Sequence, residues 1–276
     1  PAAMVAPTPV SALLHAVAVV KAGAFCVLRV VCYVFGPEAA SWSGGSTILS
    51  WFAIATIILS SLIAMRQDNL KARLAFSTVG QLSYIVLGIS ILSLYSIGGA
   101  IFHIVAHALL KITLFMSAGA IFVTTGLSEI STMGGLVKKM PVTSVCFTAA
   151  SIGLAGMPLM VGFISKFNIL EGAFEHSVML AVAALLAAAL LALTYLIPVV
   201  QIFFGKESEV HVDDHGHGHH EHKGFDAALP MLLPLTITII IAIIEILQLI
   251  LKCGSCDIDD IILNMLGIML SYPIFN

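Results

Sequence analysis

Three lysines lie inside long apolar stretches of the sequence. Lys21 is inside SALLHAVAVVKAGAFCVLRVVCYVF, Lys111 is inside GGAIFHIVAHALLKITLFMSAGAIF, and Lys166 is near the end of GLAGMPLMVGFISKF. A charge at the centre of a bilayer costs about 2.5–3.5 kcal/mol on insertion scales, so such residues persist mainly where they face a polar interior and have a function. Three such lysines, two of them with histidines nearby, predict a path for protons or cations.

The spacing of His103, His107 and Lys111 is the most specific feature of this set. Residues four apart lie on one face of a helix, about 6 Å from one another along the axis. Histidine exchanges protons near neutral pH, and a buried lysine can also release its proton, whereas an arginine cannot. We therefore predict a proton relay along this face. The alternative is a polar stripe that only holds helices together.

Lys21 and Lys166 complete the predicted relay. Lys21 is followed by Ala22, Gly23 and Ala24, which let a helix or a file of water approach closely. Lys166 follows a stretch interrupted by glycines and a proline, and such broken helices offer free carbonyls to a cation. The alternative for Lys166 is a lysine at the membrane surface.

A histidine-rich segment, HVDDHGHGHHEHK, begins at His211. Imidazoles and carboxylates at this density can bind Zn, Cu or Ni. Nothing in the sequence fixes their geometry, however, so we predict a solvated linker without a metal site. The residues to test for metal binding are His215, His217, His219, His220 and His222.

The composition is that of an integral membrane protein. The chain of 276 residues is 59% hydrophobic and 10% charged, with a mean hydropathy of +1.08, whereas soluble domains are about one quarter charged. A net charge of −3 gives no signal for nucleic acid or for an anionic membrane surface. Continuous apolar runs of this length predict spanning α-helices rather than the shorter strands of a barrel.

We predict an all-α polytopic bundle with about seven spans, the fifth of them discontinuous. The predicted spans are Pro9–Tyr33, Thr47–Met65, Leu74–Leu94, Ile97–Thr124, Val142–Phe174, Val178–Phe204 and Leu229–Leu251. They divide the chain into a transmembrane bundle (1–204), a His-rich loop (205–228), a further helix (229–252) and a C-terminal tail (253–276). The basic links at 66–73 and 138–139 fall on one side, which the positive-inside rule makes cytoplasmic.

The sequence carries no recognisable redox centre. It lacks the glycine pattern of a dinucleotide-binding turn and has no multi-cysteine cluster. Its one CxxC pair, Cys253 and Cys256, is more typical of incidental thiols than of a metal site. Any electron transfer is therefore expected in partner subunits.

Five segments in order resemble the antiporter-like membrane subunits of respiratory complex I, multi-subunit Na+/H+ antiporters and membrane-bound hydrogenases. They are AMVAPTPVSALLHAVAVVKAG, RQDNLKARLAFSTVGQLSYIVLGI, FHIVAHALLKITLFMSAGAI, MGGLVKKMP and GLAGMPLMVGFISKFNIL. The resemblance covers roughly residues 1–205. It implies a fold of two inverted five-helix repeats, of which this chain would form the C-terminal half.

The resemblance also implies roles. Lys21 matches the mid-membrane lysine of the first half-channel, His103, His107 and Lys111 match the central relay, and Lys166 matches the lysine of the second discontinuous helix. The glutamate that pairs with the first lysine in the family would lie upstream of Pro1.

The expected function is proton translocation within a redox-driven complex in an energy-transducing membrane, which we expect to be the prokaryotic cytoplasmic membrane. The expected partners are other antiporter-like subunits, a peripheral redox arm that holds iron–sulfur and flavin or nickel–iron centres, and the lipid bilayer. A subunit of a Na+/H+ antiporter is the nearest alternative. A metal-ion transporter that uses the His-rich loop is another, and a structural subunit with a non-conducting channel is a third.

Overall fold

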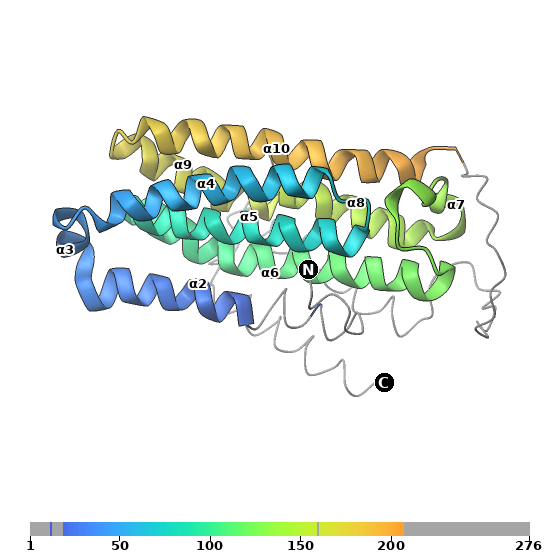
Figure 1. Ribbon diagram of the computed structural model, residues 1–276, viewed down its shortest axis with the longest axis horizontal. Helices are drawn as coiled ribbons and strands as arrows, with labels where there is room; N and C mark the ends of the chain where they lie inside the picture. Colours follow the sequence, from blue (N-terminus) through green and yellow to red (C-terminus); the bar gives the residue numbers. More distant parts are fainter. Residues whose placement is uncertain (1–11, 13–18, 159, 207–276) are drawn as a thin grey trace, which may run out of the picture.

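The computed structural model describes residues 12, 19–158 and 160–206, and this part of the chain is an elongated bundle of α-helices (Figure 1). Its long helices run side by side along one axis, and no strand occurs within the described ranges. The elements are α2 (Val19–Arg29), a π-helical turn η3 (Val30–Phe35), α3 (Gly36–Trp42), α4 (Gly45–Met65), α5 (Leu70–Ser90), α6 (Leu94–Thr125), η4 (Ile130–Thr132), α7 (Leu136–Lys139), α8 (Pro141–Ala155), α9 (Val161–Glu175) and α10 (Met179–Phe204).

Five uninterrupted segments of this part are long and apolar enough to cross a membrane, which agrees with the prediction of a polytopic helical bundle. They are 19–42, 45–65, 70–90, 94–125 and 179–204. The first span continues through η3 as far as Trp42, nine residues beyond its predicted end at Tyr33. The predicted span Leu229–Leu251, the His-rich loop from residue 207 on, and the tail lie outside the described residues.

The helix boundaries follow local capping chemistry. The Asn69 side chain accepts a hydrogen bond from the Ala72 amide at 3.1 Å and so caps α5. Ser93 caps α6 in the same way, through the Tyr95 amide. These side chains satisfy amides that a helix start leaves without an internal partner. At its other end α6 stops at Gly126, which adopts the left-handed conformation common at helix C-termini.

Helix α6 lies at the centre of the bundle. Its most apolar 18-residue window is 83% buried, compared with 17% for the span 19–42. Glycine allows α9 to come very close to it: a Cβ on Gly99 would lie 2.9 Å from the backbone of Ser165 and Ile169. The histidines and the lysine of α6 therefore lie in the most enclosed part of the described protein.

The predicted discontinuous span is present as α8 and α9, which are separated by a short non-helical break. Gly156 ends α8 with a φ of +94°, a conformation that favours glycine, and Pro158 follows. The start of α9 folds tightly onto the end of α8, since a Cβ on Gly162 would lie only 2.0 Å from the carbonyl oxygen of Gly153. The break thus has a defined, closely packed geometry.

The basic links predicted to share one side lie at the same end of the bundle. The Leu70 amide donates to the Ser128 carbonyl at 3.0 Å, and the Ile130 amide donates to the Asp68 carbonyl at 2.9 Å. These bonds join the α4–α5 link to the segment that leads to α7 (Figure 1).

Candidate functional site

His103, His107 and Lys111 lie on one face of α6, as their spacing predicts. The two imidazole rings stack with centroids 5.9 Å apart and planes 12° from parallel. All three side chains are at most 1% exposed. A line of three basic groups therefore runs along the inside of the bundle.

Helix α5 holds the end of this line in place. The Lys111 Nζ donates to the Leu74 carbonyl at 2.8 Å and to the Ser77 hydroxyl. It also lies 5.9 Å from the centroid of the Phe115 ring, on its own helix. The ammonium form of Lys111 is thus hydrogen-bonded without any carboxylate.

Ser165 of α9 orients the other end of the line. Its hydroxyl is 2.8 Å from the Nδ1 of His103 and donates to the Gly162 carbonyl at 3.1 Å. When the hydroxyl donates to Gly162 it accepts from His103, and the ring proton is then on Nδ1. The Nε2 atom of His103 is buried without a hydrogen-bond partner among the described residues and is free to accept a proton.

Lys166 binds the end of the broken helix. Its Nζ donates to the carbonyls of Leu154 at 2.7 Å and Ala155 at 3.3 Å, which are the last two residues of α8. Such terminal carbonyls have no partner inside their own helix and form the negative end of its dipole. The ammonium group therefore lies in the break rather than reaching outward as a membrane-surface lysine would.

Tyr84 of α5 connects Lys166 with the histidines and was not among the predicted residues. The Lys166 Nζ is 5.0 Å from the centroid of the Tyr84 ring, and that ring is 6.0 Å from the His103 ring. The Tyr84 hydroxyl is buried and has no hydrogen-bond partner in the described part of the chain. Tyr84 fills the space between the two predicted sites.

The sequence did contain a pattern that indicates the contribution of Tyr84 and α5. Ser77, Gln81 and Tyr84 recur at intervals of four and three residues, so they share one face of α5. All three are buried. The polar face of α5 therefore lies against the polar face of α6.

Lys21 reaches the interior from α2. Its side chain is 6% exposed, and its Nζ has no hydrogen-bond partner among the described residues. Helix α2 packs against α5, where Ala24 and Leu28 lie in one cluster with Ile85 and Ile89. Lys21 is therefore an interior group that α2 contributes, although no side chain of the described residues holds it.

The interior is strongly basic. The carboxylates of the described residues, Glu38, Asp68, Glu129, Glu171 and Glu175, are all exposed and lie near the ends of helices. Three lysines and two histidines thus share the enclosed space without a counter-charge from this part of the chain. At this density of like charge the lysines cannot all be protonated at once without strong mutual repulsion.

No group of three or more His, Cys, Asp or Glu residues that could bind a metal occurs in the described ranges. The candidates His215, His217, His219, His220 and His222 lie outside those ranges, so their role stays a prediction. The same is true of the carboxylate that the family resemblance expects beside Lys21.

The chain matches a known family over most of its length. Residues 1–192 match the family described as "NADH:quinone oxidoreductase/Mrp antiporter, TM". The chain belongs to this family and is an integral membrane protein.

Relatives of two kinds are similar to it. NADH-quinone oxidoreductase subunit N of Desulforudis audaxviator is 36% identical over 196 residues, which are 71% of this chain and 38% of that protein. A Na+/H+ antiporter subunit of Alkalihalophilus pseudofirmus is 42% identical over 183 residues, or 60% of this chain and 22% of that protein. The chain therefore spans well under half of the length of these relatives.

A solved structure is similar in fold. The structure of the membrane-bound sulfane sulfur reductase, an archaeal respiratory membrane complex, contains a chain that matches with a TM-score of 0.73 and 25% identity. The match covers 94% of this chain and 52% of that chain.

Proposed function

We propose that this chain is a proton-translocating subunit of a redox-driven membrane complex of the complex I or membrane-bound hydrogenase type. Protons would move along Lys21, His103, His107, Lys111 and Lys166. The observation that carries the proposal is the stacked, fully enclosed pair His103 and His107, with ring centroids 5.9 Å apart, on the face of α6 that ends at Lys111.

The relay works through atoms that have free hydrogen-bonding capacity. The Nε2 of His103 and both ring nitrogens of His107 have no partner within the described ranges. Ring centroids about 6 Å apart leave room for one water between the nitrogens, and a buried polar group rarely stays without a partner. When one ring nitrogen of a histidine takes up a proton, the other ring nitrogen releases one. Each histidine thus passes on a positive charge while its side chain stays in place.

Electrostatic repulsion couples the lysines. Lys21 is within electrostatic range of Lys111, and no carboxylate of the described residues lies between them. A proton on Lys21 therefore favours release of the proton from Lys111, more strongly in a low-dielectric interior than in water. In the driven complex, a redox step in a partner would begin this sequence by adding or removing charge near one lysine.

The proposed partners follow from the same argument. The chain is proposed to hold no redox cofactor, so iron–sulfur, flavin or nickel–iron centres would belong to a peripheral arm. Other antiporter-like subunits would flank it in the bilayer, and the prokaryotic cytoplasmic membrane is the proposed location. The similarity to a chain of a sulfur-reducing respiratory complex supports a redox partner.

A member of a multi-subunit Na+/H+ antiporter is the second candidate, favoured by the 42% identity to such a protein. The composition of the purified complex distinguishes the two candidates. Iron–sulfur proteins that co-purify in fixed stoichiometry support the redox-driven complex, and their absence from an active complex supports the antiporter. A metal-ion transporter is tested by deletion of 210–223, because the proton relay predicts that proton transport survives this deletion.

The function is tested by proton pumping in proteoliposomes that contain the intact complex. The variant Lys111→Ala should abolish the pH gradient at matched assembly. Lys139→Ala is the matched control, because Lys139 is an exposed lysine of α7. Unchanged pumping in Lys111→Ala would instead support a structural subunit with a non-conducting channel.

A further inference from the structure

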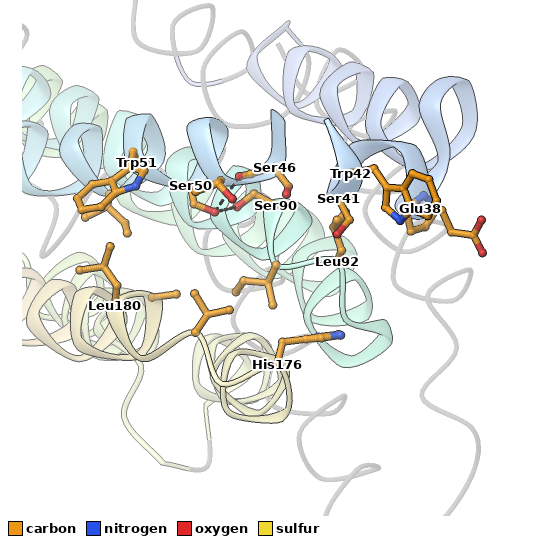
Figure 2. A pocket seen from close by; sticks show the side chains of 16 residues that line it. Glu38, Ser41, Trp42, Ser46, Ser50, Trp51, Ser90, Leu92, His176 and Leu180 are labelled. Atoms are coloured by element: carbon orange, nitrogen blue, oxygen red, sulfur yellow. Dashed lines mark hydrogen bonds between the residues drawn. The ribbon is translucent and has the colours of Figure 1, made fainter. Parts of the chain in front are cut away.

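A cavity of about 500 Å³ lies at the end of the bundle opposite the basic links, between α3, the start of α4, the end of α5 and the α9–α10 turn (Figure 2). None of the relay residues lines it. Its lining is mixed: hydroxyls and one carboxylate lie beside apolar side chains such as Ile54, Ile91 and Leu180.

The position of the cavity matches the level of the lipid head groups. Helix α4 has 21 residues, a length of about 31 Å that is close to the thickness of the hydrocarbon layer. The cavity is lined by its first turns, up to Ile54. Both tryptophans of the chain, Trp42 and Trp51, lie in the lining and are 92% and 58% exposed, and tryptophan concentrates at the membrane–water boundary.

The hydroxyls inside the cavity are acceptors. The Ser50 and Ser90 hydroxyls are 2.7 Å apart and share a hydrogen bond in which either can donate, and the other hydroxyl donates to a backbone carbonyl, that of Ser46 at 3.0 Å or that of Leu87 at 2.8 Å. Each hydroxyl has one proton and two lone pairs, so these contacts occupy both protons and leave lone pairs free. The pair can therefore accept hydrogen bonds from a ligand that brings N–H donors.

The charged residues around the cavity favour a ligand with a positively charged group. Glu38 is on the α3 side of the cavity, and the described lining contains one histidine, His176, but no lysine or arginine (Figure 2). Glu175, the last residue of α9, adds negative charge, whereas the described basic links are at the other end of the bundle and the described basic residue on this side, Arg29 at the end of α2, is outside the lining. An anionic head group is disfavoured here, and an ammonium group is favoured.

We infer that this cavity binds a phospholipid with a primary ammonium head group, of the phosphatidylethanolamine type. The ammonium donates to the Ser50–Ser90 hydroxyl pair, and the negative charge of Glu38, at the rim of the cavity, favours it over an anionic group. The acyl chains extend along Ile54, Ile91 and Leu180 toward the bilayer centre. The inference does not depend on what the relay transports.

The test is a titration of the intact, detergent-purified protein with defined lipids, read by native mass spectrometry. Dioleoyl phosphatidylethanolamine, phosphatidylcholine and phosphatidylglycerol share their acyl chains and differ in their head groups. We expect the ethanolamine lipid to bind roughly tenfold more tightly than the glycerol lipid, because a charge-assisted bond of about 1.4 kcal/mol corresponds to that factor. The choline lipid should also be weaker, since its quaternary ammonium has no N–H donor.

Two variants locate the site. Glu38→Gln should reduce the preference for the ethanolamine lipid over the glycerol lipid, whereas Glu129→Gln, an exposed carboxylate at the opposite end of the bundle, should leave the preference intact. Thr47→Phe fills the cavity from its rim and should remove the tight binding event. Equal binding of the three lipids to the unaltered protein overturns the inference, as does a preference that survives Thr47→Phe.

Discussion

The three interior lysines are held in two different ways, according to the region that carries them. Lys111 and Lys166 lie in the packed unit of α5, α6, α8 and α9, and each donates to backbone carbonyls of a neighbouring helix. Lys21 lies on the span 19–42, which is only 17% buried at its most apolar window, and its Nζ has no hydrogen-bond partner within the described ranges. The packed unit therefore fixes the positions of Lys111 and Lys166 through its own carbonyls. The position of Lys21, on the peripheral span, depends instead on groups outside that unit.

Glycine substitutions should give the largest difference in stability between the packed unit and the span 19–42. An alanine at position 162 places its Cβ 2.0 Å from the Gly153 carbonyl, whereas an alanine at position 23 meets nothing within 4 Å. We expect Gly162→Ala to lower the free energy of unfolding by about 3 kcal/mol or more, because the backbone of the break must move. Gly23→Ala should be neutral or stabilising, since alanine favours helix by about 1 kcal/mol. Thermal unfolding of the purified protein measures both, and equal effects would contradict the contrast.

Substitutions of the interior lysines should give the second-largest difference in stability. Lys166→Met leaves the carbonyls of Leu154 and Ala155 without their donor and should cost about 2 kcal/mol of stability. Lys21→Met removes a buried amine that has no described partner, so it should leave stability unchanged or raised. Chemical denaturation of both variants makes the comparison, and a larger loss in Lys21→Met would show that its partner is structurally important.

Tyr84→Phe tests whether the two parts of the packed unit communicate. The substitution keeps the ring that lies between Lys166 and His103 and removes only a hydroxyl that has no partner among the described residues. Stability should change by less than about 0.5 kcal/mol. If this hydroxyl carries protons between the break and α6, pumping at matched turnover should fall roughly threefold to tenfold, within the range of a proton-transfer contribution. Pumping equal to that of the unaltered protein would exclude the Tyr84 hydroxyl from the path.

Substitutions of Ser165 and Ser144 should give the smallest difference in stability. Ser165→Ala removes the hydrogen bond to His103 Nδ1 and should cost about 1 kcal/mol. Ser144 is equally buried, but its hydroxyl has no hydrogen-bond partner in the described part of the chain. Ser144→Ala should therefore be close to neutral. The NMR signals of a selectively labelled His103 ring should shift only in Ser165→Ala, and a shift in both variants would contradict a specific contact between Ser165 and His103.

Much of the architecture was predictable because membrane helices leave strong periodic signals. Long apolar runs predicted the spans, and the glycines and Pro158 of the fifth predicted span predicted the break between α8 and α9. The four-residue spacing of His103, His107 and Lys111 gave their common face. These features depend on local sequence and on the bilayer, which leaves few alternatives for the backbone.

The contacts between helices were not predictable in the same way. That Lys111 bonds to Leu74 and Ser77, or that Tyr84 lies between Lys166 and His103, depends on how α5 packs against α6 and α9. That packing depends on close approaches such as the one at Gly88 of α5, where a Cβ would lie 3.1 Å from Ala100 of α6 and 3.2 Å from Ile169 of α9, and no local pattern specifies these approaches. The continuation of the first span from Tyr33 to Trp42 also went unseen, because Gly36 and Pro37 indicate a helix end, whereas a further short helix, α3, begins at these two residues.

The most direct test of the relay is substitution of its central group. His107 makes no hydrogen bond through either ring nitrogen to any described residue, so His107→Phe removes proton transfer while it keeps the volume of the ring. We predict that the intact complex with this variant assembles, turns over its electron donor and fails to build a pH gradient in proteoliposomes. A gradient equal to that of the unaltered complex, at the same turnover, would contradict proton movement along this face of α6.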